Sequence, residues 1–304
     1  MKKIQPYILI YIAITITLVA TFTGAANVLA NTASARTKEL SLPNNSFDIP
    51  VVQNRQVKKW IKYFCTKGRS KFISYGQRAG RYAPLLRKIL VQQQLPEDLI
   101  FLAMAESGFY NRAKSSAHAV GPWQFISSTA LEYGLKIDRF VDERKDPIKS
   151  TVAAGNYLKK LYAEFGSWEL AFAAYNAGEG KVWGAIRYQR TYDFWELSRG
   201  DLLKSETKEH IPKIMALAII GKNLELFGLH NIDFATPLDF EELSLPPGVD
   251  LRSLSSQLGE SYNLIRNYNP ELRRTITPLN LAYYPLRVPV GTVAKWNSCC
   301  KNKK

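Results

Sequence analysis

Cysteine is scarce in this chain of 304 residues, which contains only Cys65, Cys299 and Cys300. An odd number does not suit a disulfide framework, and the spacing of the three matches no common metal site. The scarcity therefore argues against a small disulfide scaffold, and we predict no metal and no cofactor. The two adjacent cysteines near the C-terminus could cross-link molecules in an oxidising compartment, although unpaired thiols are the simpler expectation.

Acidic residues are also in the minority, because 26 Asp and Glu stand against 41 Lys and Arg and leave a net charge of +15. A strongly basic chain favours anionic partners, namely nucleic acid, a membrane surface or an acidic polymer. The hydrophobic content of 46% is enough for a packed core. At this length the chain can form one large domain or two modest ones.

The N-terminus narrows the list of partners. Lys2 and Lys3 precede an apolar run from Tyr7 to about Phe22, and the small residues that follow include a plausible cleavage site at 28–30. This layout is typical of a secretory signal peptide, so we predict a signal peptide over 1–30. The apolar run is also nearly long enough to be an uncleaved membrane anchor. Export excludes nucleic acid and favours a periplasmic or cell-envelope location, with membrane association left open.

The region 51–235 is predicted to be mainly α. Apolar residues recur there at three- and four-residue spacing, as in Val57, Trp60, Ile61 and Phe64, and no convincing strand pattern precedes residue 235. Further helices are expected at about 127–133, 149–165, 167–177, 179–187 and 207–226.

Changes in composition along the chain predict the other domain boundaries. Residues 31–50 are polar and are predicted to be a linker, and the shift near Thr236 and Pro237 begins a second unit. This unit, 236–291, has the pattern of two short helices between short extended segments. Residues 292–304 are predicted to be a basic tail.

Glu106 is the candidate with the most suggestive surroundings. It follows a run of apolar residues, Leu99 to Ala105, and lies two positions before Gly108. Apolar surroundings disfavour a charged carboxylate, and the carbonyl dipoles at a helix end repel an anion. A carboxyl group held in its protonated form can act as the acid that cleaves a sugar–sugar bond. Alone the feature is weak, because a glutamate at a helix end is usually just solvated.

Neighbouring motifs identify a family. The chain resembles the soluble lytic transglycosylases, glycoside hydrolase family 23, and within them the membrane-bound lytic murein transglycosylase D branch, over roughly residues 55–290. The segments that carry the resemblance are Leu95 to Leu99, Glu106 to Phe109, Ser115 to Phe125, Ala174 to Gly180 and Glu206 to Lys213.

The resemblance implies a lysozyme-like α fold around a sugar-binding groove. It implies peptidoglycan glycan strands as the partner, cleaved at the β-1,4 bond between N-acetylmuramic acid and N-acetylglucosamine. By the same resemblance Glu106 is the single general acid and base, and the products carry 1,6-anhydromuramic ends.

A single carboxylate is unusual, because most glycosidases use two. Near Glu106 we find no second carboxylate in a motif of equal quality. The charged residues Glu132, Asp138, Asp142 and Glu143 are interpreted as solvated surface. The N-acetyl group of the substrate could replace the second carboxylate. A distant Asp brought close by folding is the open alternative.

The resemblance also suggests substrate-binding residues. Ser115 and Gln124 would line the groove and bond the sugar, although turn and cap chemistry would explain them too. Trp123 could stack on a sugar or lie in the core. Tyr175 and Asn176 would form the floor of the site, and a core tyrosine with a capping asparagine is the plainer interpretation.

Two histidines depart from the family pattern. His210 stands where the family usually has a tyrosine that helps to hold the catalytic carboxyl. An imidazole can also donate a hydrogen bond, but free histidine titrates near pH ~6.5. A protonated His210 would favour the anionic glutamate and oppose its role as an acid. His118 stands where small or amide residues are usual, and we expect a polar turn residue at the lip of the groove.

The C-terminal unit resembles a degenerate LysM module, a βααβ fold that binds N-acetylglucosamine chains. Gly259, Asn269-Pro270 and Val288-Pro289 carry the similarity. A clear glycine-aspartate-threonine opening is missing, so a structural cap is as good an interpretation as a sugar-binding module. Two other functions stay open for the whole chain: a goose-type lysozyme that uses water, and a non-catalytic peptidoglycan-binding protein.

Overall fold

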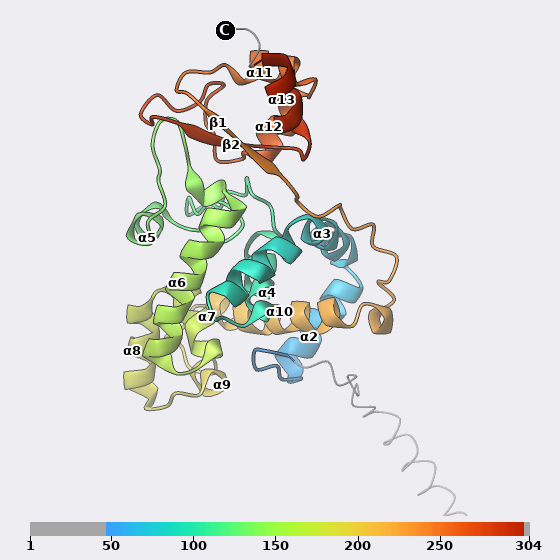
Figure 1. The fold of residues 1–304 in the computed structure, drawn as a ribbon. Coiled ribbons are helices and arrows are strands. Elements are labelled where there is room, and N and C mark those ends of the chain that lie inside the picture. Colours follow the sequence, from blue (N-terminus) through green and yellow to red (C-terminus); the bar gives the residue numbers. More distant parts are fainter. Residues whose placement is uncertain (1–46, 301–304) are drawn as a thin grey trace, which may run out of the picture. The chain divides into compact units, whose positions relative to one another are not determined.

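The structure, a computed structural model, describes residues 47–300 (Figure 1). The predicted signal peptide and most of the predicted linker lie outside the described residues. The last part of the predicted linker belongs to the folded unit, because Ile49 is buried and the backbone N–H of Asp48 donates to Asp98. Among residues 47–300, no helix has the length and apolar character needed to cross a membrane.

Helices dominate the part of the chain that the structure describes, and its two strands come late in the sequence. No named strand precedes residue 235 in this part, as predicted. The α-helices are α2 (Arg55–Cys65), α3 (Arg69–Gln92), α4 (Ile100–Ser107), α5 (Ser127–Glu132), α6 (Pro147–Phe165), α7 (Trp168–Ala177), α8 (Glu179–Gln189), α9 (Phe194–Leu197), α10 (Ser205–Lys222), α11 (Leu251–Leu258), α12 (Tyr262–Tyr268) and α13 (Thr292–Cys300).

Short polar residues cap the N-termini of several of these helices, as their known preference for this position predicts. Asp146 caps α6 by accepting from two backbone N–H groups, with Pro147 at the first helical position, and Ser167 caps α7. α10 ends at Lys222, earlier than predicted. The Asn223 side chain there donates to the Ile219 carbonyl, which would otherwise accept the next backbone bond of the helix.

α10 is the central helix of the larger region and packs against α2, α4 and α7 (Figure 1). Every residue from His210 to Ile220 is buried except Lys213. A helix that is apolar on all sides must be enclosed by other elements. The packing therefore places two polar side chains of α10, those of His210 and Lys213, within the protein interior, where α4 ends.

The C-terminal unit is a small α+β module, so the predicted mainly α fold with a βααβ unit is confirmed. β1 (Glu241–Leu245) and β2 (Tyr284–Val288) pair in antiparallel register, with Leu243 opposite Leu286, and α11 and α12 lie between them in the sequence. Leucines of β1, β2 and α11 share one core with Ile265 of α12, and this core also takes in Phe140 and Val141 of the preceding region.

The predicted basic tail needs correction as far as Cys300. Thr292–Cys300 form α13, and Val293 and Trp296 pack against the core of the C-terminal unit. The backbone N–H of Val293 also donates to the Glu241 carboxylate. Most lysines of the predicted tail follow this segment, at 301, 303 and 304, and the two apolar residues at helical spacing within it hold the helix against the core of the unit.

A buried ionic triad joins the two regions. Arg287 of β2 donates to both carboxylate oxygens of Asp146, at 3.1 and 2.8 Å, and its Nη2 lies 2.7 Å from Glu271 Oε1. Tyr284 Oη donates to the same Glu271 oxygen at 2.6 Å. The side chains of Arg287, Asp146 and Glu271 are at most 4% exposed. The N-cap of α6 is thus bonded directly to the C-terminal sheet.

The charged segment before α6 is not the solvated surface that its composition suggests. Asp142 and Glu143 are only 4% and 6% exposed. Arg144 donates to both oxygens of Asp142, while Glu143 accepts from the Lys136 backbone and pairs with Lys149. Buried charges of this kind are tolerated because each has a partner of opposite sign or a backbone donor. Sequence alone did not reveal those partners.

Candidate active site

Glu106 lies in the last turn of α4, at the wall of a cavity of about 450 Å³. The six preceding residues, Ile100 to Ala105, are all buried, and the Glu106 side chain is 13% exposed. This cavity, the Glu106 cavity, has a volume typical of small-ligand sites. The local prediction therefore agrees with the structure: an apolar helix ends at a carboxyl group that has limited access to solvent.

Gly108 makes the end of α4 possible. It adopts φ +59° and donates its backbone N–H to the Met104 carbonyl. A Cβ at this position would stand 2.1 Å from Cδ1 of Tyr75, so the left-handed conformation and the close approach both demand glycine. The Ser107 hydroxyl then donates to the Pro122 carbonyl at 2.8 Å. These contacts fix the position of Glu106 relative to the loop that forms the opposite wall.

Ser115 and Gln124 both line the Glu106 cavity. Their side chains also have the local roles of the plainer interpretation. Ser115 Oγ accepts from the Ala119 backbone at 3.1 Å, and Gln124, at φ +51°, donates to the Gly121 carbonyl at 2.8 Å. His118 is an exposed turn residue at φ +60°, between two residues that line the cavity, as predicted.

Trp123 does not reach the cavity, contrary to its prediction as a substrate-binding residue. It is 0% exposed, and its indole N–H donates to Thr151 Oγ1 at 2.8 Å. The indole N–H must find a partner when the ring is buried, and a threonine of α6 supplies it. The neighbouring Phe125 lines the cavity instead and packs edge-on against Tyr175.

Tyr175 and Asn176 end α7 at the cavity. Tyr175 Oη donates to the Trp123 carbonyl at 2.7 Å, and Asn176 Oδ1 accepts from the Thr207 hydroxyl of α10 at 2.8 Å. Burial, together with the nearby Glu106 and Tyr157 side chains, holds the pKa of Tyr175 well above its usual value. The phenol is therefore a fixed neutral group beside Glu106.

His210 meets Glu106 in the structure. Its Nε2 lies 3.1 Å from Glu106 Oε1, and the two side chains are 7% and 13% exposed. The contact satisfies the distance of an ion pair but not the geometry of a hydrogen bond. His210, the residue that departs from the family pattern, is therefore in direct contact with Glu106, the candidate acid.

Lys213 is a residue that the motif pattern did not single out. It follows His210 by three residues on α10, and its ammonium donates to the Ala105 carbonyl, immediately before Glu106. Burial lowers the pKa of Lys213, and the nearby Glu106 acts in the opposite direction. The helical spacing of three was the one sequence signal that could have revealed it, because residues three apart share a helix face.

Two further carboxylates, of Glu179 and Glu206, line the Glu106 cavity. Glu179 accepts from Tyr157 Oη at 3.3 Å and pairs with Lys160 at 3.2 Å, whereas Glu206 is exposed in the first turn of α10. Both belong to motifs noted above, but their closeness to Glu106 depends on how α7, α8 and α10 pack. The cavity therefore contains three carboxylates rather than one.

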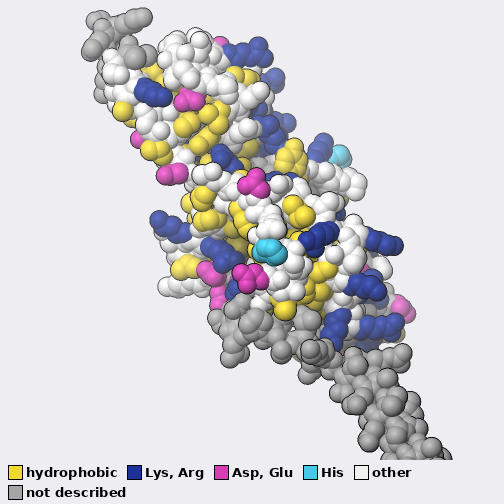
Figure 2. All heavy atoms as spheres, turned by 90° about the vertical axis from the view of Figure 1, so that its right-hand side faces the viewer, with side chains coloured by type: hydrophobic (Ala, Val, Ile, Leu, Met, Phe, Trp, Pro, Cys, Tyr) yellow, Lys and Arg dark blue, Asp and Glu magenta, His cyan; other side chains and the backbone are white. Residues whose placement is uncertain are grey.

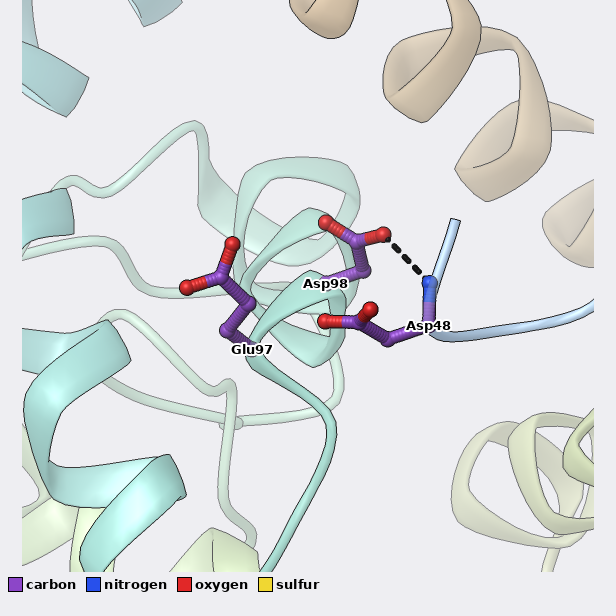
Figure 3. Close-up of side chains that lie close together, drawn as sticks. All are labelled: Asp48, Glu97 and Asp98. Atoms are coloured by element: carbon purple, nitrogen blue, oxygen red, sulfur yellow. Dashed lines mark hydrogen bonds between the residues drawn. The ribbon is translucent and has the colours of Figure 1, made fainter. Parts of the chain in front are cut away.

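Asp48, Glu97 and Asp98 form a separate acidic cluster at the start of η1 (Glu97–Leu99), with oxygens within 4.8 Å of one another (Figure 3). Lys222 pairs with the fully buried Asp98 at 2.6 Å, and Arg87 pairs with Glu97 at 3.1 Å. Cations of the chain thus balance two of the three carboxylates. We interpret the cluster as an anchor for the segment 47–50.

Comparisons with known proteins agree with this site. The family model described as Transglycosylase SLT domain matches residues 85–198, which include Glu106, the loop with Ser115 and Gln124, and α7. The model described as Lytic transglycosylase MltD, LysM-like domain matches residues 239–302, which include β1, β2 and α13.

Curated relatives point the same way. The chain is 37% identical over 199 residues to the membrane-bound lytic murein transglycosylase D of Escherichia coli K12, covering 63% of this chain and 43% of that protein. The same values hold for the protein of that name from E. coli O6:H1. The chain thus spans less than half the length of these relatives.

Solved structures give more distant likenesses. The 70 kDa soluble lytic transglycosylase SLT70 of E. coli shares 23% identity over 45% of this chain and 23% of its own, with a TM-score of 0.40. An inactive mutant of the lytic transglycosylase Slt of Pseudomonas aeruginosa shares 23% identity over 46% and 24%, with a TM-score of 0.39.

Two family models match in succession, and the first contains the glutamate at the end of α4 together with most of its cavity. Residues 85–198 of this chain therefore match the transglycosylase SLT domain family, and residues 239–302 match the LysM-like domain family of lytic transglycosylase MltD.

Proposed function

We propose that the chain is a peptidoglycan lytic transglycosylase that cleaves the β-1,4 bond between N-acetylmuramic acid and N-acetylglucosamine. The observation that carries the proposal is the position of Glu106: a carboxyl group of low exposure, at the wall of a ligand-sized cavity, in contact with polar groups from a second helix. The names of the curated relatives support the same chemistry.

In the proposed reaction Glu106 first acts as a general acid. Its proton passes to the glycosidic oxygen as the bond to C1 of the muramic residue breaks, and the N-acetylglucosamine leaves with a free hydroxyl. The carboxylate then accepts the proton of the muramic C6 hydroxyl, whose oxygen forms the new bond to C1. Glu106 is protonated again at the end of the cycle, and the product carries a 1,6-anhydro ring.

The surroundings of Glu106 suit both halves of this cycle. After the first step the anionic form lies beside Lys213 and His210, which can stabilise negative charge. The neutral Tyr175 adds no charge that would oppose either form. Ser115, Gln124 and Asn176 have polar atoms at the cavity wall, where a sugar could accept or donate hydrogen bonds.

Glu179 supports a second candidate function. A carboxylate in the same cavity could activate water, as in a hydrolase of the goose-type lysozyme kind, if its separation from Glu106 suited an inverting mechanism. Its bonds to Tyr157 and Lys160 argue against this role, because they engage both carboxylate oxygens that would have to reach the water.

Product analysis separates the two functions. Purified sacculi are digested in isotopically labelled water, and the soluble muropeptides are examined by mass spectrometry. A transglycosylase yields anhydro ends, one water lighter than reducing ends and without label at C1. Reducing ends that carry labelled oxygen would refute the proposal in favour of hydrolysis. Glu179→Gln should leave the anhydro yield within twofold, and no cleavage at all would favour a peptidoglycan-binding protein.

We also propose an envelope location for the chain. The relatives are membrane-bound by name, and the predicted signal peptide would direct export. Cell fractionation tests the location: the chain is expected with the periplasm or membranes, and recovery in the cytosol would contradict it.

A further inference from the structure

A cluster of basic side chains lies where the SLT region meets the C-terminal unit. Its members come from three segments of the chain, and we name them the junction cluster: Arg112, Arg139, Lys145, Arg266, Arg273 and Arg274. Arg112, Arg139, Arg273 and Arg274 are exposed, and Lys145 and Arg266 are half-buried. The net charge of +15 shows an excess of cations, and Lys and Arg side chains are also scattered over the face in Figure 2. The junction cluster differs because its members touch one another's backbones.

Carbonyl groups hold the guanidiniums of the junction cluster. Arg112 Nη2 donates to the Arg266 carbonyl and Arg266 Nη1 to the Arg274 carbonyl, both at 3.0 Å. Arg273 Nη1 donates to the carbonyl of Asp138 at 2.7 Å, and Arg274 Nε to that of Arg139 at 3.1 Å. Carbonyls orient these side chains without neutralising them, so each guanidinium keeps a full charge and further N–H donors.

The carboxylates beside the cluster are already engaged. Asp142 is bonded on both oxygens by Arg144. Asp138 accepts from the backbones of Phe140 and Val141 and from the Asn280 side chain. The electrostatic result is visible at Lys145, whose pKa is lowered by burial and then by Arg273, Arg112 and Arg144, although Asp142 opposes the effect.

Cavities open onto the cluster. Two of them, of about 500 and 530 Å³, share Arg139, Arg273 and Arg274 as lining residues. A third, of about 570 Å³, is lined by Arg112 and by Tyr110, whose ring lies under the Arg78 guanidinium. The five arginines of the cluster outnumber the nearby Asp138 and Asp142 carboxylates, of which Asp138 attracts Arg273. Arginines in excess beside hollows of this size suit an anion with planar geometry, since the guanidinium fork matches a carboxylate.

The chain itself links this cluster to the Glu106 cavity. Arg112 and Ser115 are three residues apart, so their Cα atoms are at most about 11 Å from each other. Ser115 lines the Glu106 cavity. A muramic residue bound there carries a peptide stem, whose free carboxylates would extend two to three residues, about 7–11 Å, from the sugar.

We infer that the junction cluster binds the carboxylates of peptide stems on the glycan strand. The inference rests on the proposed function, and it makes stem-bearing strands the preferred substrate over bare glycan. The C-terminal unit then contributes to substrate choice through Arg266, Arg273 and Arg274, whether or not it binds sugar.

The test compares two substrates with the full chain: glycan strands that keep their stems, and the same strands stripped by an amidase. Arg273→Gln with Arg274→Gln removes two charges while keeping polar side chains. Lys88→Gln with Arg187→Gln is the matched control on exposed positions of α3 and α8. Thermal unfolding and cleavage of stripped strands check that each variant is folded.

Wild-type protein is expected to favour stem-bearing strands about tenfold in kcat/KM, as expected for one or two charge-assisted bonds, with a preference that falls as salt rises. The arginine variant should lose most of this preference and cleave stripped strands within twofold of wild type. The control should keep the preference.

Equal cleavage of both substrates by the wild type, or an unchanged preference in the arginine variant, would overturn the inference. Cosedimentation of the protein with each strand type measures binding apart from cleavage. Absence of anhydro products would therefore defeat the proposed function while leaving the binding result interpretable. Competition by inorganic phosphate but not by the free stem peptide would assign the cluster to phosphate-bearing polymers instead.

Discussion

Two buried carboxylate sites of this chain are built in opposite ways. Asp146 has both oxygens bonded to Arg287 and also caps α6 through two backbone N–H groups. Glu106 is similarly enclosed, but in the described part of the chain its carboxylate has a single ion-pair contact, with His210 at 3.1 Å. Asp146 is thus held by bonds on both oxygens, whereas Glu106 has few fixed partners and faces a cavity that a ligand can enter.

The difference separates a structural role from a chemical one. Removing a partner from Asp146 would leave an uncompensated charge in the interior. Removing the charge of Glu106 would leave little unpaired, so the fold should tolerate it. Substitutions at the two sites should therefore affect different observables.

Glu106→Gln has the largest expected effect on activity. Loss of the general acid should lower the rate of anhydro-product release by on the order of a hundredfold to ten-thousandfold. The free energy of unfolding, measured in urea, should change by less than about 1 kcal/mol. Glu225→Gln, at an exposed position, is the matched control. Activity within tenfold of wild type would remove Glu106 from the mechanism.

Arg287→Met has the largest expected effect on stability. It leaves Asp146 and Glu271 buried without their cation, which should cost about 3–5 kcal/mol of unfolding free energy. Urea unfolding measures the loss, and Arg187→Met on the surface of α8 should change it by less than about 0.5 kcal/mol. Similar values for both variants would show that the triad is not a major tie between the two regions.

Lys213→Met should lower kcat by about tenfold with little change in KM, because one charge-assisted bond at the end of α4 is lost. The wild-type pKa of Lys213 is lowered from 10.5, so the unfolded chain binds more protons below that pH. Wild-type stability should therefore rise relative to the variant as pH increases toward about 10.5. Lys208→Met is the control on the same helix, and equal effects on kcat would contradict a positioning role.

His210→Tyr should move the acid limb of the pH–rate profile, because His210 Nε2 lies 3.1 Å from Glu106 Oε1 and a phenol in its place cannot carry a positive charge. His118→Tyr, in the exposed turn, should leave the profile unchanged. Superimposable profiles for His210→Tyr and wild type would refute any coupling between residue 210 and the proton of Glu106.

Glu271→Gln should have the smallest effect, and it depends on pH. Burial, then the nearby Asp146 carboxylate, raises the pKa of Glu271 above its usual value of 4.5. The folded chain thus binds more protons than the unfolded chain above pH 4.5, and this contribution to stability is lost as pH rises through the folded pKa. The wild type should weaken relative to the variant from pH 5 to 8 in thermal unfolding. Parallel curves would contradict a raised pKa.

Local features of the molecule were accessible from sequence. The apolar run before Glu106 and the glycine after it describe a helix end, and α4 ends there. Predictions that depended on packing were less successful. Trp123 is of a residue type that often stacks on sugars. In the structure its indole N–H donates a hydrogen bond to Thr151, so the ring belongs to the core. Asp142 and Glu143 are residue types usually found at the surface, yet both are buried, Asp142 against the buried Arg144 and Glu143 against the half-exposed Lys149.

The sequence by itself determined the helical character of the region before residue 235, the end of α4 at Glu106, and the βααβ pattern that follows. These depend on spacing and on turn residues within a few positions of one another. Only the tertiary structure decided that Lys213 and His210 meet the end of α4, that Glu179 and Glu206 share its cavity, and that Arg287 bonds to Asp146. Such pairs join residues far apart in the chain, and helical periodicity carries no information about which elements pack together.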